Sequence, residues 1–73
     1  MTWTDAADLA RLLHQKLPRR DPLTLRFPDL ERWVRELPGF TAPEPATPAE
    51  LESIQQAWYA RFSHELARKP SSR

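Results

Sequence analysis

The stretch that decides the fold reads Asp21-Pro22-Leu23-Thr24-Leu25-Arg26-Phe27, and it is followed by Asp29-Leu30 and Trp33. Asp-Pro favours a turn, because proline fixes its own φ and removes a backbone donor. Residues 23–27 then alternate apolar and polar side chains, which predicts a short extended segment with Leu23, Leu25 and Phe27 facing inward. Five residues cannot form a stable sheet alone, so we expect at most a minor extended segment.

A first helix is predicted over residues 5–17, before this stretch. Leucines at helical spacing give it one apolar face, and Pro18 ends it because the residue before a proline disfavours helical geometry. Thr4 or Asp5 can cap the helix, and Asp5 with Asp8 resembles a capping box. Trp3 precedes the cap, where an aromatic ring can fold back onto the helix start.

Two further helices are predicted after it. The second begins beside Pro28 and ends at Pro38-Gly39, after which Phe40 folds back onto the core. The third begins at Thr47-Pro48-Ala49-Glu50, a capping box with proline at the first helical position, and continues to about residue 67. The predicted core comprises Leu9, Leu12, Leu13, Leu17, Leu25, Phe27, Leu30, Trp33, Val34, Leu37, Leu51, Ile54 and Trp58. Trp33 should lie at the centre of the second helix's apolar stripe.

Length and composition restrict the class of protein. A chain of 73 residues buries roughly 60% of its unfolded surface, and with no cysteine it has neither disulfides nor zinc–thiolate sites to reinforce the core. We expect one domain over residues 1–68 and a polar tail over 69–73. The N-terminus has no apolar run and no stretch is long enough to span a bilayer, which predicts a cytoplasmic protein without membrane contact.

Enzyme activity is not expected from these residues. Gly39 is the single glycine, so a glycine-rich phosphate loop is excluded. The two histidines, His14 and His64, lie on different predicted helices without metal-ligand spacing. With no cysteine, the candidate nucleophiles are serines and threonines, and none has a recognisable base nearby in sequence.

The net charge of +1 conceals an uneven distribution. Five bases between residues 11 and 26 face a single acid, Asp21: they are Arg11, Lys16, Arg19, Arg20 and Arg26. Much of the remaining pattern places acids at helix starts and bases at helix ends, as the helix dipole favours. Arg26, Arg32 and Arg35 could contact phosphates in a small winged-helix nucleic-acid-binding protein, the alternative interpretation. Against it, acids that would repel a phosphate backbone share the second helix: Asp29, Glu31 and Glu36.

The decisive stretch, together with Trp3-Thr4-Asp5 at the start of the chain, resembles the IscX family of bacterial iron–sulfur cluster assembly accessory proteins. The similarity extends through Leu37, Phe40, Leu51 and Ile54 to Trp58 and covers roughly three-quarters of the chain. It implies an all-α fold of three helices resembling a modified winged helix. It also implies a non-enzymatic adaptor that binds the cysteine desulfurase IscS as a monomer.

The resemblance further implies which residues meet the partner and what metal is involved. Acids expected in the family stand at the following positions, which are the predicted partner-binding residues: Asp5, Asp8, Asp21, Asp29 and Glu36. Family members bind ferrous iron weakly through surface carboxylates, since hard cations prefer oxygen ligands. This chain has Thr41-Ala42-Pro43-Glu44-Pro45 where the family carries an acidic run, so we expect no tightly bound cofactor and weak Fe²⁺ binding at most. Whether cluster assembly is inhibited or activated stays open, as does the role of the basic C-terminus.

Overall fold

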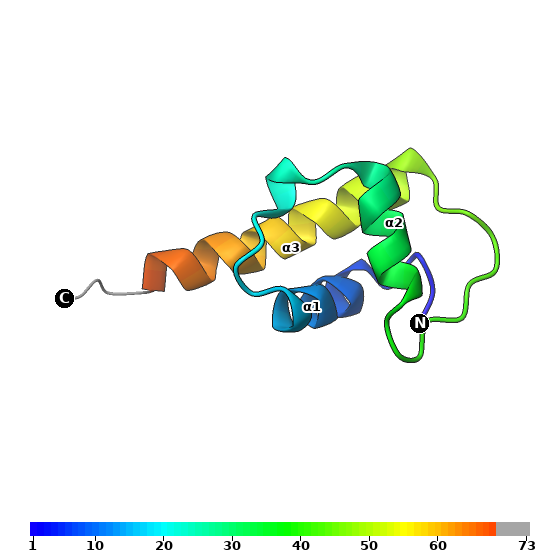
Figure 1. The fold of residues 1–73 in the computed structure, drawn as a ribbon, viewed down its shortest axis with the longest axis horizontal. Coiled ribbons are helices and arrows are strands. Elements are labelled where there is room, and N and C mark those ends of the chain that lie inside the picture. The colour runs from blue at the N-terminus through cyan, green and yellow to red at the C-terminus, as the bar shows by residue number, and fades with distance from the viewer. Residues whose placement is uncertain (69–73) are drawn as a thin grey trace.

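The computed structural model describes residues 1–68, and the predicted polar tail over 69–73 lies outside the described residues. In chain order the elements are helix α1 (Ala6–Lys16), a 3₁₀ turn η1 (Pro22–Thr24), helix α2 (Phe27–Arg35) and helix α3 (Pro48–Arg68) (Figure 1). No strand occurs within residues 1–68, so the all-α class is confirmed. The winged-helix detail and the domain boundary stay predictions.

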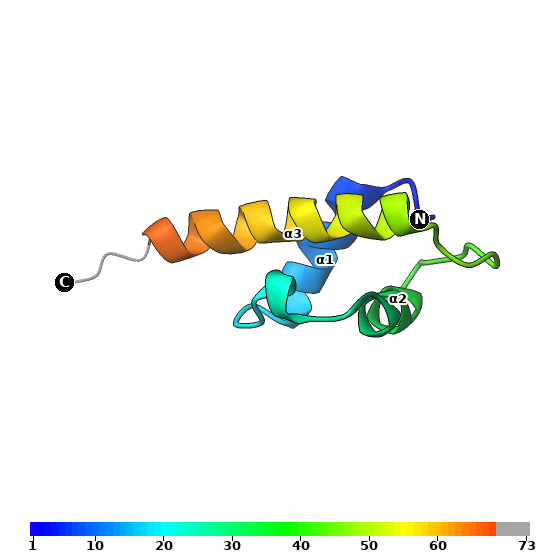
Figure 2. The same cartoon turned by 90° about the horizontal axis from the view of Figure 1, so that it is seen from above.

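Helix α3 forms the long axis of the molecule. Helices α1 and α2 and the turn η1 all contact it, and its C-terminal end continues beyond the other elements (Figure 1). Seen from above, α1 begins on one side of α3 and ends on the other, on the side that carries η1 and α2 (Figure 2). The surface of the molecule therefore has an α2 side and an opposite side where α1 begins.

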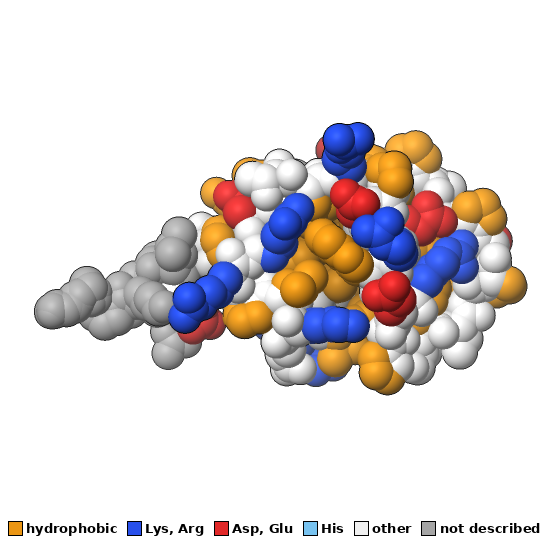
Figure 3. All heavy atoms as spheres, viewed as in Figure 1, with side chains coloured by type: hydrophobic (Ala, Val, Ile, Leu, Met, Phe, Trp, Pro, Cys, Tyr) orange, Lys and Arg blue, Asp and Glu red, His pale blue; other side chains and the backbone are white. Residues whose placement is uncertain are grey.

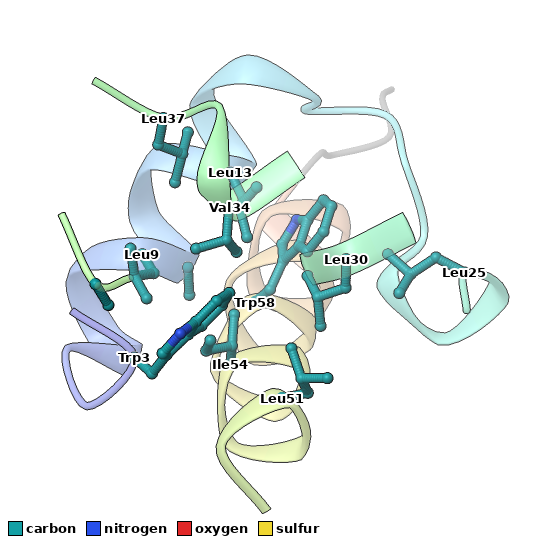
Figure 4. Packing of buried hydrophobic residues seen from close by; sticks show 12 residues of the cluster. Trp3, Leu9, Leu13, Leu25, Leu30, Val34, Leu37, Leu51, Ile54 and Trp58 are labelled. Atoms are coloured by element: carbon teal, nitrogen blue, oxygen red, sulfur yellow. The ribbon is translucent and has the colours of Figure 1, made fainter. Parts of the chain in front are cut away.

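The core lies where the three helices meet. Its buried side chains are Trp3, Leu9, Ala10, Leu13, Leu25, Leu30, Val34, Leu37, Ala42, Leu51, Ile54 and Trp58 (Figure 4). The largest of them are Trp3, 2% exposed, and Trp58, fully buried. Burial of large aromatic surface is the main stabilising term open to a chain of this size.

Sequence reasoning placed Trp58 in the core but left Trp3 at its edge. Trp3 contacts Phe40 edge to face, with ring centroids 4.6 Å apart. Its indole Nε1 donates to the backbone carbonyl of Glu44 at 2.7 Å. Met1 and Thr41 are also joined, because the Thr41 N–H donates to the Met1 carbonyl at 2.9 Å. The segment before α1 is therefore packed onto the loop after α2, and this contact between distant segments buries Trp3.

The predicted extended segment after Asp21-Pro22 is wrong at its first half. The Asp21 carboxylate accepts from the Leu23 N–H at 3.0 Å, and the Thr24 N–H and hydroxyl both donate to the Asp21 carbonyl. These bonds close a 3₁₀ turn, in which side chains do not alternate between two faces. Leu25 is consequently buried, whereas Leu23, predicted to face inward, is 51% exposed.

Four predicted core residues lie at the edge of the core, where they are partly buried: Leu12, Leu17, Phe27 and Trp33. In α2 the inward face is defined by Leu30 and Val34, and Leu37, just beyond the helix, is also buried. Trp33 borders that face and meets Trp58 edge to face, with ring centroids 6.5 Å apart. The prediction that Trp33 lies at the centre of the apolar stripe of α2 is wrong, because Leu30 and Val34 are fully buried whereas Trp33 is only partly buried.

Of the two capping boxes predicted at helix starts, the one at α3 is confirmed and the one at α1 is wrong. At α3, the Thr47 N–H donates to Glu50 Oε1 at 2.9 Å and the Glu50 N–H donates to Thr47 Oγ1 at 3.2 Å, which is the predicted capping box. At α1, Asp5 occupies the cap position but its side chain makes no capping bond to the helix. Its carboxylate accepts instead from the Thr2 N–H at 2.8 Å, so the capping box proposed for Asp5 and Asp8 is wrong.

Candidate functional site

The five acids predicted to meet a partner fall into two groups. Asp5 and Asp8 stand at the start of α1, on the side of α3 away from α2. Asp21 caps η1, Asp29 lies in the first turn of α2 and Glu36 is its C-cap, and both elements lie on the α2 side (Figure 2). The fold therefore gathers three of the five acids on one side of the molecule.

The first group is partly engaged by its own chain. The Asp5 carboxylate is held by the Thr2 N–H. Asp8 is exposed and pairs with Arg11 one turn along α1, at 3.7 Å. An exposed pair of this kind contributes little to stability and is easily opened by a partner.

The second group is engaged to different degrees. The Asp21 carboxylate accepts from the Leu23 N–H and so maintains η1. Asp29 pairs with Arg32 at 3.1 Å. Glu36 is exposed and forms no ion pair within 4.0 Å with any described residue. Asp21 likewise has no ion-pair partner among the described residues, so Asp29 is the acid of this group whose charge is offset by a neighbouring base.

Basic side chains alternate with the acids along α2. Arg35 pairs with Glu31 at 3.3 Å and also donates to the carbonyls of Ala42 and Glu44. Figure 3 shows blue and red side chains interspersed around an apolar patch on this side. The surface on this side is therefore of mixed charge.

The alternative interpretation, a nucleic-acid-binding protein, gains nothing from this geometry. Of the three arginines proposed as phosphate contacts, Arg32 is paired with Asp29, and Arg35 with Glu31 and two backbone carbonyls. Only Arg26 has no ion-pair partner among the described residues. Phosphate binding depends on several uncompensated bases acting together.

Candidate metal ligands are dispersed over the described surface. Within residues 1–68 no group of three or more His, Asp or Glu side chains lies close enough together to hold a metal ion. An open groove between the start of α1 and the start of α3 is lined by Trp3, Thr4, Ala6, Ala49, Glu50 and Ser53. None of the predicted partner residues lines it, and its one carboxylate, that of Glu50, is occupied in the capping box.

Sequence reasoning noted the run of bases between the first two helices but assigned it no role. The structure places Arg20 over the Trp33 ring, with the guanidinium carbon 5.3 Å from the ring centroid. It also exposes Leu23 in the same connection. The signal available beforehand was the excess of four bases over one acid in residues 16–26, which are Lys16, Arg19, Arg20 and Arg26 against Asp21.

These features define a class: a small all-helical protein whose charged side chains lie on its surface and are available to another macromolecule. Across the described part of the chain, no helix combines the length and the hydropathy needed to span a bilayer. The chain belongs to the IscX family, because the family model described as iron–sulphur cluster assembly matches residues 1–63. Its role accordingly lies in iron–sulfur cluster assembly, among accessory proteins of the assembly machinery.

A relative shares most of the chain. An uncharacterized protein of Pseudomonas aeruginosa is 42% identical over 59 residues, which cover 80% of this chain and 89% of that protein. No solved structure matches the chain. The residues matched by the family model include α1, η1, α2 and most of α3.

Proposed function

We propose that this protein is a non-enzymatic adaptor of iron–sulfur cluster assembly that binds the cysteine desulfurase IscS. The α2 side, with Asp21, Asp29 and Glu36, meets a basic surface of the desulfurase. Asp5 and Asp8 form a second acidic area, which adds to the electrostatic attraction between this protein and the desulfurase. We further propose that it acts as a monomer in the cytoplasm.

Family membership over residues 1–63 is the observation that carries this proposal. The described surface supports it in one respect: Glu36 is exposed and unpaired, and Asp29 is held by a single exposed arginine. Rearranging an exposed pair costs little, so both carboxylates are available to a basic partner. Charges of this kind mainly set the rate of encounter and the register of the complex.

The test is a double charge reversal, Asp29→Lys with Glu36→Lys. Binding to purified desulfurase, measured by isothermal titration, should weaken at least tenfold, or about 1.4 kcal/mol. The melting temperature should change little, because the lost ion pair with Arg32 is exposed. Added salt should weaken the wild-type complex, since the Debye length falls from ~10 Å at 0.1 M to ~3 Å at 1 M.

The matched control is Glu44→Lys with Glu52→Lys, which changes the net charge equally. Both residues are exposed, in the loop before α3 and on α3, and neither belongs to the predicted partner set. The control should bind within about twofold of wild type at 0.15 M salt, because distant exposed charges are screened. Equal weakening of desulfurase binding by both variants would show that net charge, and not the α2 side, determines the affinity. Unchanged binding of the first variant, with tighter binding to duplex DNA, would favour the nucleic-acid alternative.

A further inference from the structure

A second surface of this protein lies beside the α2 acids and has the opposite charge. It consists of side chains of the connection between α1 and α2 other than Asp21, together with the partly buried Trp33, and its residues are Arg19, Arg20, Leu23, Arg26 and Trp33. We propose that this basic–aromatic patch binds an acidic segment of another protein in which carboxylates flank an apolar side chain. The proposal goes beyond desulfurase binding, because it concerns a different partner chemistry.

The bases of the patch form no ion pair within the described part of the chain, although Arg20 covers the Trp33 ring. Arg19, Arg20 and Arg26 are exposed, and none has a carboxylate within 4.0 Å among the described residues. By contrast, the ion pairs of the described residues employ Arg11, Arg32 and Arg35. Three like charges close together in sequence destabilise a folded chain slightly through mutual repulsion. An acidic partner would remove that repulsion.

The patch also presents apolar surface to solvent. Leu23 is the exposed large apolar side chain of the described residues, at 51%. Trp33 is partly buried, and its ring is covered on one side by the Arg20 guanidinium, 5.3 Å from the ring centroid. Arginine and tryptophan are the residues most enriched among those that dominate binding energy at protein interfaces.

The connection is rigid before any partner binds. The Asp21 carboxylate and carbonyl accept from Leu23 and Thr24, which fixes η1. Gln55 on α3 donates to the Pro22 carbonyl at 2.9 Å and so attaches η1 to the core. The Arg20 N–H donates to the Leu17 carbonyl at 3.1 Å. A surface already held in its binding conformation loses less entropy when a partner docks.

The charges and the apolar side chains of the patch favour a protein segment over a nucleic acid as its partner. A phosphate backbone is recognised by several bases acting along its length, about 6–10 contacts in well-studied cases. The patch has three bases, and the acids Asp29 and Glu36 of α2 lie on the same side. A continuous line of phosphates would meet those acids. A short acidic segment with one apolar residue matches both the arginines and the exposed Leu23.

The probe is a fluorescein-labelled synthetic peptide in which glutamates flank a central Leu-Phe pair. Fluorescence anisotropy at near-physiological salt should show saturable binding. A peptide with lysines in place of the glutamates should not bind. Arg20→Glu with Arg26→Glu should weaken binding at least tenfold. Leu23→Ser should weaken it several-fold without altering charge. Amide chemical-shift changes on binding should include Arg20 and Leu23.

The matched control is Arg11→Glu with Arg61→Glu, two exposed bases outside the patch, and it should keep near wild-type affinity. Asp29→Lys with Glu36→Lys should tighten peptide binding while it weakens desulfurase binding, so the two proposals fail independently. No saturable binding of the acidic peptide would overturn the patch proposal. Equal loss in the control pair would also overturn it. Tighter, patch-dependent binding to a DNA or RNA oligonucleotide would reassign the patch to nucleic acid.

Discussion

The guanidinium carbon of Arg35 lies 5.4 Å from the ring centroid of Trp3, which places the end of α2 over the segment that precedes α1. Arg35 also donates to the carbonyls of Ala42 and Glu44, at 3.3 and 3.0 Å. The Trp3 indole donates to the same Glu44 carbonyl. Two side chains thus hold the proline-rich loop against the core, where few backbone donors are available to hold it by regular secondary structure.

Replacing Arg35 by lysine should loosen this loop. Lysine keeps the charge but loses the planar fork that reaches two carbonyls and the Glu31 carboxylate together. We expect a loss of about 1–2 kcal/mol in free energy of unfolding, from the hydrogen bonds given up. Amide hydrogen exchange at Thr41 should also accelerate. Arg32→Lys, which affects only the exposed pair with Asp29, should change stability by less than about 0.5 kcal/mol. Equal effects of the two variants would contradict this role for Arg35.

The two tryptophans that meet edge to face should differ in their importance for folding. Trp58 is fully buried, and truncating such a residue to alanine costs about 3–5 kcal/mol. That is about the whole stability expected at this size, so Trp58→Ala should be largely unfolded at room temperature. Trp33 is partly buried, so Trp33→Ala should cost less, about 0.5–3 kcal/mol, and keep a cooperative melt. Thermal melts followed by circular dichroism compare the stabilities of the two variants. A folded Trp58→Ala would contradict the assignment of Trp58 to the core.

The capping box of α3 should be measurable as a coupling between two side chains. Thr47→Ala removes the acceptor of the Glu50 N–H and should cost about 1 kcal/mol in free energy of unfolding. Glu50→Ala removes the acceptor of the Thr47 N–H. Because the two bonds fix one conformation of the helix start, the double variant should lose less than the sum of the single losses. Strict additivity in urea titrations would show that the two bonds act independently.

Ferrous iron should bind weakly, at a high micromolar dissociation constant or above. The carboxylates of the described residues form no group of three that could share a cation, and Asp29 is paired with an arginine. Surface acids without a shared geometry attract hard cations only through their summed field. Anaerobic isothermal titration with Fe²⁺ measures this directly. A stoichiometric site of low micromolar affinity would contradict the prediction, and repeating the titration with Asp5→Asn and Asp8→Asn would locate it.

Local sequence determined the elements whose signals lie within a few residues. Thr47, Pro48 and Glu50 start α3 through a cap that needs only adjacent side chains, and proline and glycine end the first two helices for reasons of backbone geometry. The apolar periodicity likewise gave the inward faces of all three helices, with Leu9, Leu13, Leu30, Val34 and Ile54 among the fully buried residues. The all-α class follows from these local rules.

The tertiary structure decided what depends on distant partners. Trp3 enters the core because the loop after α2 supplies Phe40 and a carbonyl for its indole, about 40 residues away, and no local pattern encodes that contact. Leu23 turns outward because Asp21 closes a 3₁₀ turn that is attached to α3 through Gln55. The ion pairs of α2, by contrast, join residues three or four positions apart and are local to the helix. Arg32 and Arg35 form exposed ion pairs with Asp29 and Glu31, whereas Arg20, Arg26 and Glu36 have no ion-pair partner among the described residues.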